Sequence, residues 1–409
     1  MNKLRFSRKQ IFRIAEAKAG NKSLSSLLEA IPDPRKAKNK KYPLKDILIV
    51  ILFGLSCGCT NVVATCAEGK YIKKALKRYF GIEKRPSHDT CSRILRLLNP
   101  VYLNYVLWSW AGLLTEGEES HICYDGKAVR AAAKNKGKNG KEYSTYILNV
   151  FNASFGVFLG QKMVGKKKSE ISVLPGVIEK TDIEGNTVTI DAMGTHTKII
   201  SQILEQNGSF MLPAKSNQKK LLRNIADILI EAEKEDKKIT DEEQKRVQSG
   251  TYTESGHGRD ETRQISLVHV PDPSSFSENA WKDIKTVIKI KRTSVDRKTK
   301  KTTEQEVYYI TNTTPSCEEA NDVIRNHWSC EVAHYILDGE RFMEDRCNAR
   351  NSYAIENLAA LRKFAFNLHR ILEIRNGQRN EVFKADRFLA HNIKAFKLLL
   401  EEPTPRISA

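Results

Sequence analysis

The chain has 409 residues, 40% of them hydrophobic, with 68 lysines and arginines against 49 aspartates and glutamates. This length predicts two or three domains with a substantial core. The net charge of +19 and a pI near 9.4 favour a polyanionic partner, nucleic acid before a membrane surface, because the charge is spread over many segments. A basic but otherwise ordinary enzyme is the less favoured interpretation.

Eight cysteines in a chain of this length do not resemble the disulfide framework of a small secreted domain, so reduced thiols are expected. Cys57 and Cys59 lack a second Cys or His pair at zinc-finger spacing, which argues against structural zinc there. The opening residues MNKLRFSRKQIFRI carry charges where a signal peptide has its apolar core. These features predict a cytoplasmic protein.

Residues 1–45 hold thirteen Lys and Arg against three Asp and Glu. Pro32, Pro34 and Pro43 prevent a continuous helix, so this basic run is expected to be an exposed arm. A solvated tail and a segment that contacts phosphates are equal alternatives for it.

Residues 47–67 carry no charge, but only 47–55 are strongly apolar. This composition favours a buried helix, or two helices that meet near residues 56–60, over a membrane span. The helical pattern extends from 44 to 113. Within it, Ser87 or Asp89 is expected to cap a helix that stops at Asn99 and Pro100. Two basic helices joined by a short turn fit helix-turn-helix DNA binding, but they also fit any small helical domain.

After Gly117 the pattern changes to strands interleaved with helices, which indicates an α/β layer. The expected elements are a strand over 121–129, a hairpin over 146–165 that turns at 154–156, a helix near 169–180, a strand over 187–193, a helix over 195–206 and a strand over 209–215. A long charged helix is expected over 216–246. It is followed by strands that form a second sheet, over 251–270, 286–294 and 306–312. The remaining expected elements are helices over 316–338 and 352–374, then one basic amphipathic helix and a tail in the last thirty residues.

The helix over 316–338 carries Glu331 and Asp338 seven residues apart, which places the two carboxylates on one face. Trp328, Tyr335 and Ile336 are expected to provide its packing surface. Carboxylates on a packed helix suit a divalent metal, provided that other segments supply further ligands.

Two apolar runs upstream each end in an aspartate, Asp125 and Asp191. If both residues end adjacent strands, their carboxylates lie side by side at one sheet edge, and Glu331 on a helix over the sheet completes a triad. Phosphodiester hydrolysis and transesterification use two Mg²⁺ ions about 3.5 to 4 Å apart. Three converging acids and a basic surface would supply such a site and its DNA.

Structural alternatives exist for each acid. An Asp after a strand is frequently a turn former or a helix cap. Glu331 could be a solvated residue or a partner of Arg325 or Arg341. Glu331 and His334 also have the Glu-x-x-His spacing of di-iron bundles, but the second copy that such a site needs is missing.

Several blocks, in order over about residues 25 to 370, resemble those of the ISAs1-type insertion-sequence transposases, the H-repeat-associated proteins of the wider IS4-like group. They are YDGKAVRAA, VTIDAMGTHTKI with LPAKSNQ, SGHGRDETR, RNHWSCEVAHYILDGERFMEDR and NLAALRKFAFNL. IPDPRKAKNKKYPLKDILIVILFG and SHDTCSRILRLL are similar to that family's N-terminal associated domain. The resemblance implies a DDE transposase of α/β class, with a ribonuclease H-like mixed sheet and helices, a β-rich insertion before the last catalytic helix, and an all-α N-terminal domain.

The implied division of the chain has six parts. They are a basic arm (1–45), a helical and DNA-binding associated domain (46–117), the first part of the catalytic core (118–215), a helix plus β-rich insertion (216–315), the last part of the core (316–375), and a basic C-terminal helix and tail (376–409).

The resemblance also implies Asp125, Asp191 and Glu331 as the catalytic acids, which would bind two Mg²⁺ ions, with Mn²⁺ as a substitute. The residues expected to contact DNA or shape the site are Lys127, Arg130, Lys215, Asn217, Gln218, His257, Arg259, Arg325 and His327. Plain loop structure is an equal alternative for 215–218 and 257–259. The chain departs from the family at Val332 and Gly339, where the family usually has Asn and Val. The Tyr-Arg-Glu-Lys signature of IS4-like enzymes is not recognisable in this sequence.

The implied activity is binding of the element's terminal inverted repeats, hydrolysis that releases a 3′ hydroxyl, and attack of that hydroxyl on target DNA. No covalent enzyme intermediate is needed, so no Ser or Tyr nucleophile is expected. The implied partners are transposon ends, target DNA and a second copy of the chain in a homodimer, with no membrane. The implied location is the bacterial cytoplasm, at the nucleoid when the protein is bound to DNA. A non-catalytic DNA-binding derivative and a host ribonuclease H-like nuclease are the alternative functions.

Overall fold

The computed structural model describes residues 23–132, 135–136, 142–143, 145–164, 170–191, 194–215, 218–238, 246–256, 258–270, 276, 281–339, 341–376 and 382–402. The chain divides into two compact units. The first comprises Met1–Glu118, Asp125–Asp182 and Cys330–Ala409, and the second comprises Glu119–Tyr124 and Ile183–Ser329. Strand β1 (His121–Val129) and helix α11 (Cys317–Asp338) therefore contribute to both units.

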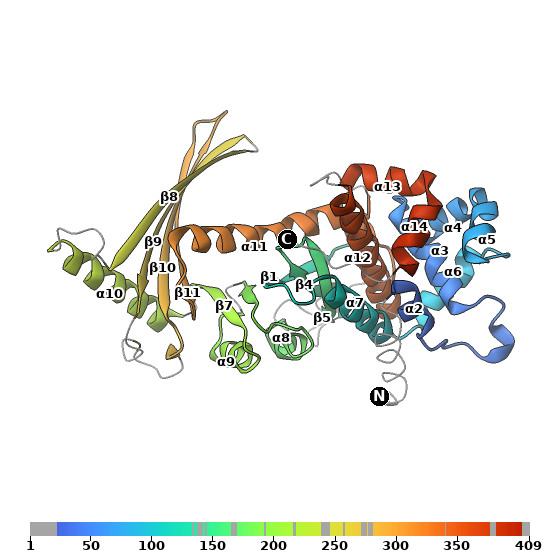
Figure 1. Cartoon of the computed structure of the whole chain (residues 1–409), viewed down its shortest axis with the longest axis horizontal. Coiled ribbons are helices and arrows are strands. Elements are labelled where there is room, and N and C mark those ends of the chain that lie inside the picture. The colour runs from blue at the N-terminus through green and yellow to red at the C-terminus, as the bar shows by residue number, and fades with distance from the viewer. Residues whose placement is uncertain are drawn as a thin grey trace. The chain divides into compact units, whose positions relative to one another are not determined.

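The first unit opens with the helices drawn in blue to teal in Figure 1. Capping side chains and a proline mark where several of them begin. Ser87 accepts a hydrogen bond from the Thr90 N–H at the start of α6, and Asn99 caps α7, which begins at Pro100. The helical pattern predicted over 44–113 is therefore confirmed. The helices are α2 (Leu24–Glu29), α3 (Leu44–Ser56), α4 (Val62–Tyr71), α5 (Lys73–Phe80), α6 (His88–Leu97) and α7 (Pro100–Leu114).

The uncharged stretch 47–67 forms two helices, α3 and α4, which is one of the two predicted alternatives. The chain turns between them at Gly58, whose φ of 87° is accessible to glycine at no steric cost. None of the helices in the described part of the chain has the length and hydrophobicity that crossing a membrane requires.

The prediction of an exposed N-terminal arm is wrong for residues 24–29, which form helix α2. Leu24, Leu27 and Leu28 of α2 are buried, and the helix packs against α3, α7 and α14 (Ile393–Glu401). The reason is a short leucine stripe at helical spacing, which the surrounding positive charge obscured. By contrast, Lys36, Lys38 and the neighbouring lysines are exposed.

The rest of the first unit is built around α12 (Ser352–Arg375), which is buried along most of its length and contacts α3, α6, α7 and β5. Its Phe364 packs on Trp110 of α7 with ring centroids 5.6 Å apart. β4 (Thr145–Asn152) and β5 (Val157–Val164) form the predicted hairpin, and the strand order in this unit is β5–β4–β1. α8 (Glu170–Ile178) packs on β5. The single C-terminal helix predicted from the sequence is wrong: Asn392 caps α14 and separates it from α13 (Val382–His391).

One glycine of β5 fits a close contact with α7. A Cβ built on Gly160 would overlap the indole of Trp108 more closely than any real side chain tolerates. Gly160→Ala is therefore expected to lower the free energy of unfolding by about 1–3 kcal/mol, measured by urea titration. Gly112→Ala on α7, where a Cβ meets nothing within 4 Å, is the control and is expected to be neutral or slightly stabilising. An equal loss in both variants would contradict the packing explanation.

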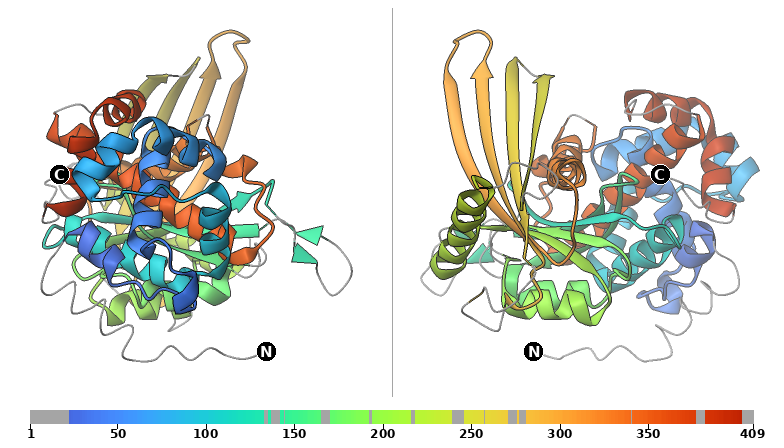
Figure 2. Two further views of the ribbon diagram at one scale, coloured as in Figure 1. Left: turned by 90° about the vertical axis from the view of Figure 1, so that its right-hand side faces the viewer. Right: turned by 60° about the vertical axis from the view of Figure 1, so that its left-hand side comes forward.

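The second unit contains a mixed sheet with the strand order β1–β6–β7–β11–β10–β9–β8. β1, β6 (Thr187–Ile190) and β7 (Ser209–Ala214) are parallel to one another. From β7 onward in this order, each strand pairs antiparallel with the next: β7 with β11, β11 with β10, β10 with β9 and β9 with β8. The helices are α9 (Thr197–Glu205), which packs on β7, and α10 (Lys219–Asp236), which packs on β8 and β9. Figure 2 shows the long strands in yellow to orange: β8 (Val247–Gly256), β9 (Arg259–His269), β10 (Thr286–Asp296) and β11 (Thr302–Thr311).

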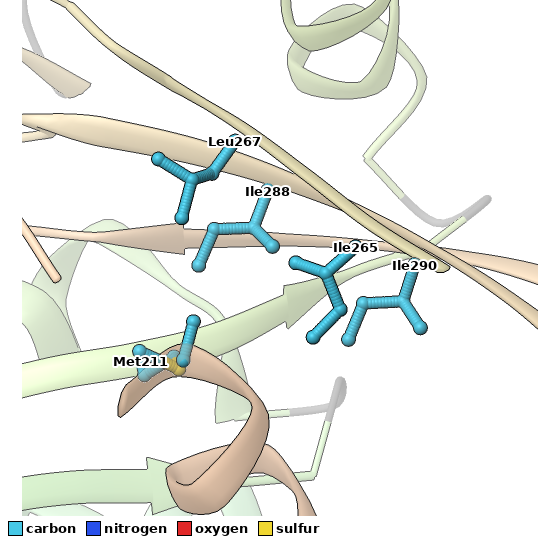
Figure 3. Close-up of a cluster of buried hydrophobic side chains, with 6 residues drawn as sticks. Met211, Ile265, Leu267, Ile288 and Ile290 are labelled. Atoms are coloured by element: carbon cyan, nitrogen blue, oxygen red, sulfur yellow. The ribbon is translucent and has the colours of Figure 1, made fainter. Parts of the chain in front are cut away.

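The prediction of a separate second sheet is wrong, because β11 pairs with β7 and so joins the two groups of strands. Ile310 lies opposite Leu212 in this pairing, and both side chains are buried. The strand predicted over 251–270 is instead a hairpin that turns at Gly258, where φ is 77°. The sheet and the first half of α11 enclose a core of Met211, Ile265, Leu267, Ile288, Ile290 and Ala320 (Figure 3).

Candidate active site

The three acids predicted as catalytic lie in different surroundings. Asp191 directly follows β6, as predicted. It is exposed, and Lys215 Nζ lies 3.5 Å from its Oδ1. Asp125 is half-buried and lies in the middle of β1, so its predicted place at a strand end is wrong. The strand continues beyond it to Val129, and the side chains of Lys127 and Val129 are buried. Glu331 is an exposed residue of α11. Asp125 and Glu331 belong to the first unit and Asp191 to the second.

Asp125 has potential metal ligands beside it in the first unit. Ligand atoms of Asp125, Cys330 and His334 all lie within 4.8 Å of one another. The Asn149 amide donates to His334 Nε2 at 2.9 Å, so the ring proton is on Nδ1, which faces Asp125 Oδ2 at 3.5 Å. The sequence suggests His334 only as part of a di-iron pattern. Its spacing of four from Cys330 places both side chains on one helix face, and that spacing is the signal from which this group could be predicted.

A second group lies in the second unit, and we call it the Thr189 cluster: His121 and Cys123 of β1, Thr189 of β6 and His327 of α11. Thr189 Oγ1 lies 2.7 Å from His121 Nε2, 2.6 Å from His327 Nδ1 and 3.4 Å from Cys123 Sγ. Burial, with the neighbouring His327, lowers the pKa of His121 to about 3. Burial also lowers the pKa of His327, against the opposing influence of Asp191. Both rings are therefore neutral near pH 7.

The packing face predicted for α11 is wrong for its two aromatic residues, whereas Ile336, the third predicted residue, is half-buried. Trp328 and Tyr335 are 40% and 78% exposed, whereas the small residues Cys330 and Ala333, with Leu337, are buried. On the part of α11 in the second unit, Arg325 donates two hydrogen bonds to Glu254, at 2.9 and 2.7 Å, and lies 4.5 Å from the Trp328 ring centroid. These bonds hold the pKa of Glu254 below its usual range.

Comparison with known proteins identifies the family. Residues 116–368 match the family model described as Transposase DDE domain, and residues 25–111 match the model described as DDE_Tnp_1-associated. The chain belongs to the DDE transposase family. Its predicted resemblance to the H-repeat-associated proteins is thereby confirmed.

Relatives of this transposase span most of its length. The "H repeat-associated putative transposase YhhI" of Escherichia coli K12 is 27% identical over 85% of this chain and 90% of its own length. The protein YbfL of the same strain is 28% identical over the same shares. Among solved structures, the piggyBac transposase synaptic complex with hairpin DNA covers 97% of this chain and 81% of its own at 12% identity. Its TM-score of 0.39 is too low to establish a shared fold.

A buried ionic cluster lies in the first unit of the transposase. We call it the Lys127 cluster: Lys127, Asp338, Glu344, Asp345 and Lys363. Lys127 Nζ lies 2.8 Å from Glu344 Oε2, contacts Asp338 closely and lies 3.7 Å from Asp345. Lys363 Nζ is 3.8 Å from the other Glu344 oxygen, and neither of these two side chains is more than 1% exposed. Nothing in the local sequence predicted this cluster, because its members are up to 236 positions apart.

The Lys127 cluster changes the pKa of two carboxyls. Burial raises the pKa of Asp338 to about 6, against the opposing charge of Lys127. Burial also acts to raise the pKa of Glu344, but the charges of Lys363, Lys127 and Arg362 outweigh it and bring the value to about 2. Glu344 is therefore a carboxylate at neutral pH, and the Lys127 side chain is occupied within the protein.

The other residues expected to contact DNA have varied surroundings. Lys215 and Arg259 are exposed, and the exposed Arg130 lies 3.4 Å from Asp345. The Gln218 amide donates to the Thr195 carbonyl, so it links the start of α10 to the residues just before α9. Two further candidates, Asn217 and His257, lie outside the described residues.

All eight cysteines lie among the described residues and are outside any disulfide, which agrees with the reduced thiols that the sequence predicts. Cys123 and Cys330 each belong to one of the groups of potential metal ligands described above, whereas Cys57 and Cys59 do not.

Proposed function

We propose that this protein is an insertion-sequence transposase with a ribonuclease H-like core, whose Asp125, Asp191 and Glu331 catalyse cleavage and joining of DNA strands at the ends of its element. Hydrolysis at each end would expose a 3′ hydroxyl, which then attacks target DNA in the same site. The proposal includes a homodimer, because two ends must be brought together for joining.

The observation that carries the proposal is the convergence of β1, β6 and α11 at the Thr189 cluster. Cys123, Thr189 and His327 meet there, and one structural period later each element reaches an acid: Asp125 follows Cys123 by two residues, Asp191 follows Thr189 by two, and Glu331 follows His327 by four. Residues two apart on a strand share a face, as do residues four apart on a helix. The parallel register of β1 and β6, with Tyr124 opposite Ile190, supports the same arrangement, since an aspartate follows each of these residues.

The donor chemistry fits the divalent metal that the family implies. Three carboxylates offer hard oxygen donors, which Mg²⁺ and Mn²⁺ prefer. When bound, two such ions would activate the attacking oxygen and stabilise the leaving oxygen. The protein's own contribution is to hold the carboxylates in place, while exposed cations such as Lys215 and Arg259 would contact DNA phosphates.

The direct experiment incubates the purified protein with labelled duplexes that carry the element's terminal repeats, with and without Mg²⁺. Nicks confined to the repeat ends and dependent on metal are expected, and unrelated competitor DNA should not suppress them. Cleavage without regard to end sequence would indicate a host nuclease, and binding without cleavage would indicate a non-catalytic DNA-binding protein. In all three cases affinity should fall with salt, because phosphate contacts release counterions.

A further inference from the structure

The Thr189 cluster has no part in the chemistry proposed above, yet its contacts join three separate elements of the second unit. His121 contributes from β1, Thr189 from β6 and His327 from α11. Thr189 is 4% exposed and His121 is 5% exposed, so the contacts between them are shielded from water. Hydrogen bonds in such surroundings are stronger than at the surface, and leaving one partner unsatisfied there is costly.

The contacts of the Thr189 hydroxyl limit which atoms of the cluster can donate a proton. Thr189 Oγ1 has one proton to donate, and its two neighbouring histidines are neutral. The hydroxyl donates either to one ring or to Cys123 Sγ, which lies 3.4 Å away, so at least one ring must present an N–H to it. Such a directional arrangement tolerates little displacement of any of the three elements, since the contacts of 2.6 and 2.7 Å would be lost.

A transition-metal site is the other chemistry that these side chains offer. Ligand atoms of His121, Cys123 and His327 lie within 4.8 Å of one another, and two imidazoles with a thiolate suit zinc. However, Thr189 Oγ1 lies within hydrogen-bonding distance of all three ligand atoms, so each of them already has a hydrogen-bonding contact within the protein. The geometry therefore favours a hydrogen-bonded junction over a site that holds an ion.

We propose that the Thr189 hydroxyl, held between His121 Nε2 and His327 Nδ1, is a positioning contact that fixes β1, β6 and α11 relative to one another shortly before each element reaches its acid. His121 precedes Asp125 by four residues, Thr189 precedes Asp191 by two, and His327 precedes Glu331 by four. This inference rests on the proposed function. Its consequence is that the junction determines how well the carboxylates hold divalent metal, without touching metal or DNA itself.

The test replaces Thr189 by Val, which keeps the shape and removes the hydroxyl. Two quantities are measured: the Mn²⁺ affinity of the full-length protein, from electron paramagnetic resonance without DNA, and the rate of end cleavage at saturating DNA. Supporting contacts around metal ligands typically change affinity or activity by about 10- to 100-fold, and we expect losses of that size in both quantities. DNA affinity should stay within about twofold, and Thr189→Ser should restore both measurements because it returns the hydroxyl.

Thr286→Val is the matched control. Thr286 is also a fully buried strand threonine of the second unit, with His269 Nδ1 at 2.9 Å and a hydrogen bond to the Thr313 carbonyl at 2.7 Å. It should lose stability without a change in Mn²⁺ affinity. His121→Asn, which releases the same hydroxyl from β1, is the second variant if Thr189→Val folds poorly, and it should weaken Mn²⁺ binding in the same direction.

The outcomes separate this inference from the proposed function. If the acid variants are inactive while Thr189→Val and His121→Asn bind Mn²⁺ and cleave like Thr286→Val, the junction has no positioning role and the inference is wrong, although the function stands. Stoichiometric zinc that is lost on Cys123→Ser but retained on Cys330→Ser would also overturn it, in favour of a metal site. If the wild-type protein neither cleaves ends nor binds Mn²⁺ through the acids, the proposed function itself fails.

Discussion

Asp125→Asn, Asp191→Asn and Glu331→Gln are each expected to lower the rate of end cleavage by at least about a thousandfold. Each change removes one anionic metal ligand and with it several kcal/mol of stabilisation of the transition state, and about 1.4 kcal/mol corresponds to a factor of ten. Binding of terminal-repeat DNA should persist, because the phosphate contacts come from other residues. The measurement is single-turnover cleavage of labelled ends beside a gel-shift titration.

Glu318→Gln provides the control for this prediction, since Glu318 is an exposed acid on the same helix as Glu331. Its cleavage rate should equal that of the wild type. Wild-type cleavage by any of the three acid variants would refute the assignment of that residue. Loss of activity in Glu318→Gln as well would point to a general effect of charge on α11.

Lys127→Met is expected to lower the free energy of unfolding by about 3–5 kcal/mol. Lys127 is the shared partner of Asp338 and Glu344, and removing one member of a buried ionic group leaves uncompensated charge in the interior. Urea titration monitored by circular dichroism measures the change. Arg130→Met is the control: it removes an ion pair with Asp345, but the Arg130 side chain is 80% exposed. This change should lower the free energy of unfolding by no more than about 1 kcal/mol. Comparable losses in the two variants would contradict the importance of burial.

The same cluster predicts a dependence on pH. The pKa of Glu344 is lowered in the folded protein to about 2 from an ordinary 4.5. Its contribution to the stability of the folded protein is therefore fully present above pH 4.5 and is lost as the pH falls toward 2. The effect of Asp338 on stability has the opposite dependence on pH. Its pKa is raised to about 6, so its contribution to stability is present below pH 3.8 and is lost as the pH rises through 6. Glu344→Gln should therefore destabilise the protein near pH 6 and show a smaller further loss between pH 4.5 and 3 than the wild type. A parallel loss in both proteins would exclude Glu344 as a source of the acid sensitivity.

Local features of the fold were predictable because the residues that determine them are neighbours in the sequence. Ser87 marks a helix start by capping, and Asn99 with Pro100 marks where that helix stops. The β-branched residues before Asp191 mark a strand, although β6 ends at Ile190 and the prediction extended to residue 193. The family resemblance rested on blocks spread over most of the chain, and the family model confirms it.

Features set by distant residues were not predictable in the same way. β7 and β11 are separated by α10 and three strands, so the pairing of Leu212 with Ile310 left no local signal. Lys127 looked like an exposed cation because its carboxylate partners lie more than 200 positions away. On α11 the large aromatic residues were expected to pack, but the small side chains of Cys330 and Ala333 allow the close approach instead.

The central claim is that Asp125, Asp191 and Glu331 together hold the catalytic metal. The most direct measurement is anomalous diffraction from crystals of the protein soaked with Mn²⁺ in complex with a terminal-repeat duplex. Peaks bounded by carboxylate oxygens of all three acids are predicted. Peaks held instead by Asp125 with Cys330 and His334, and without Asp191 or Glu331, would contradict the claim.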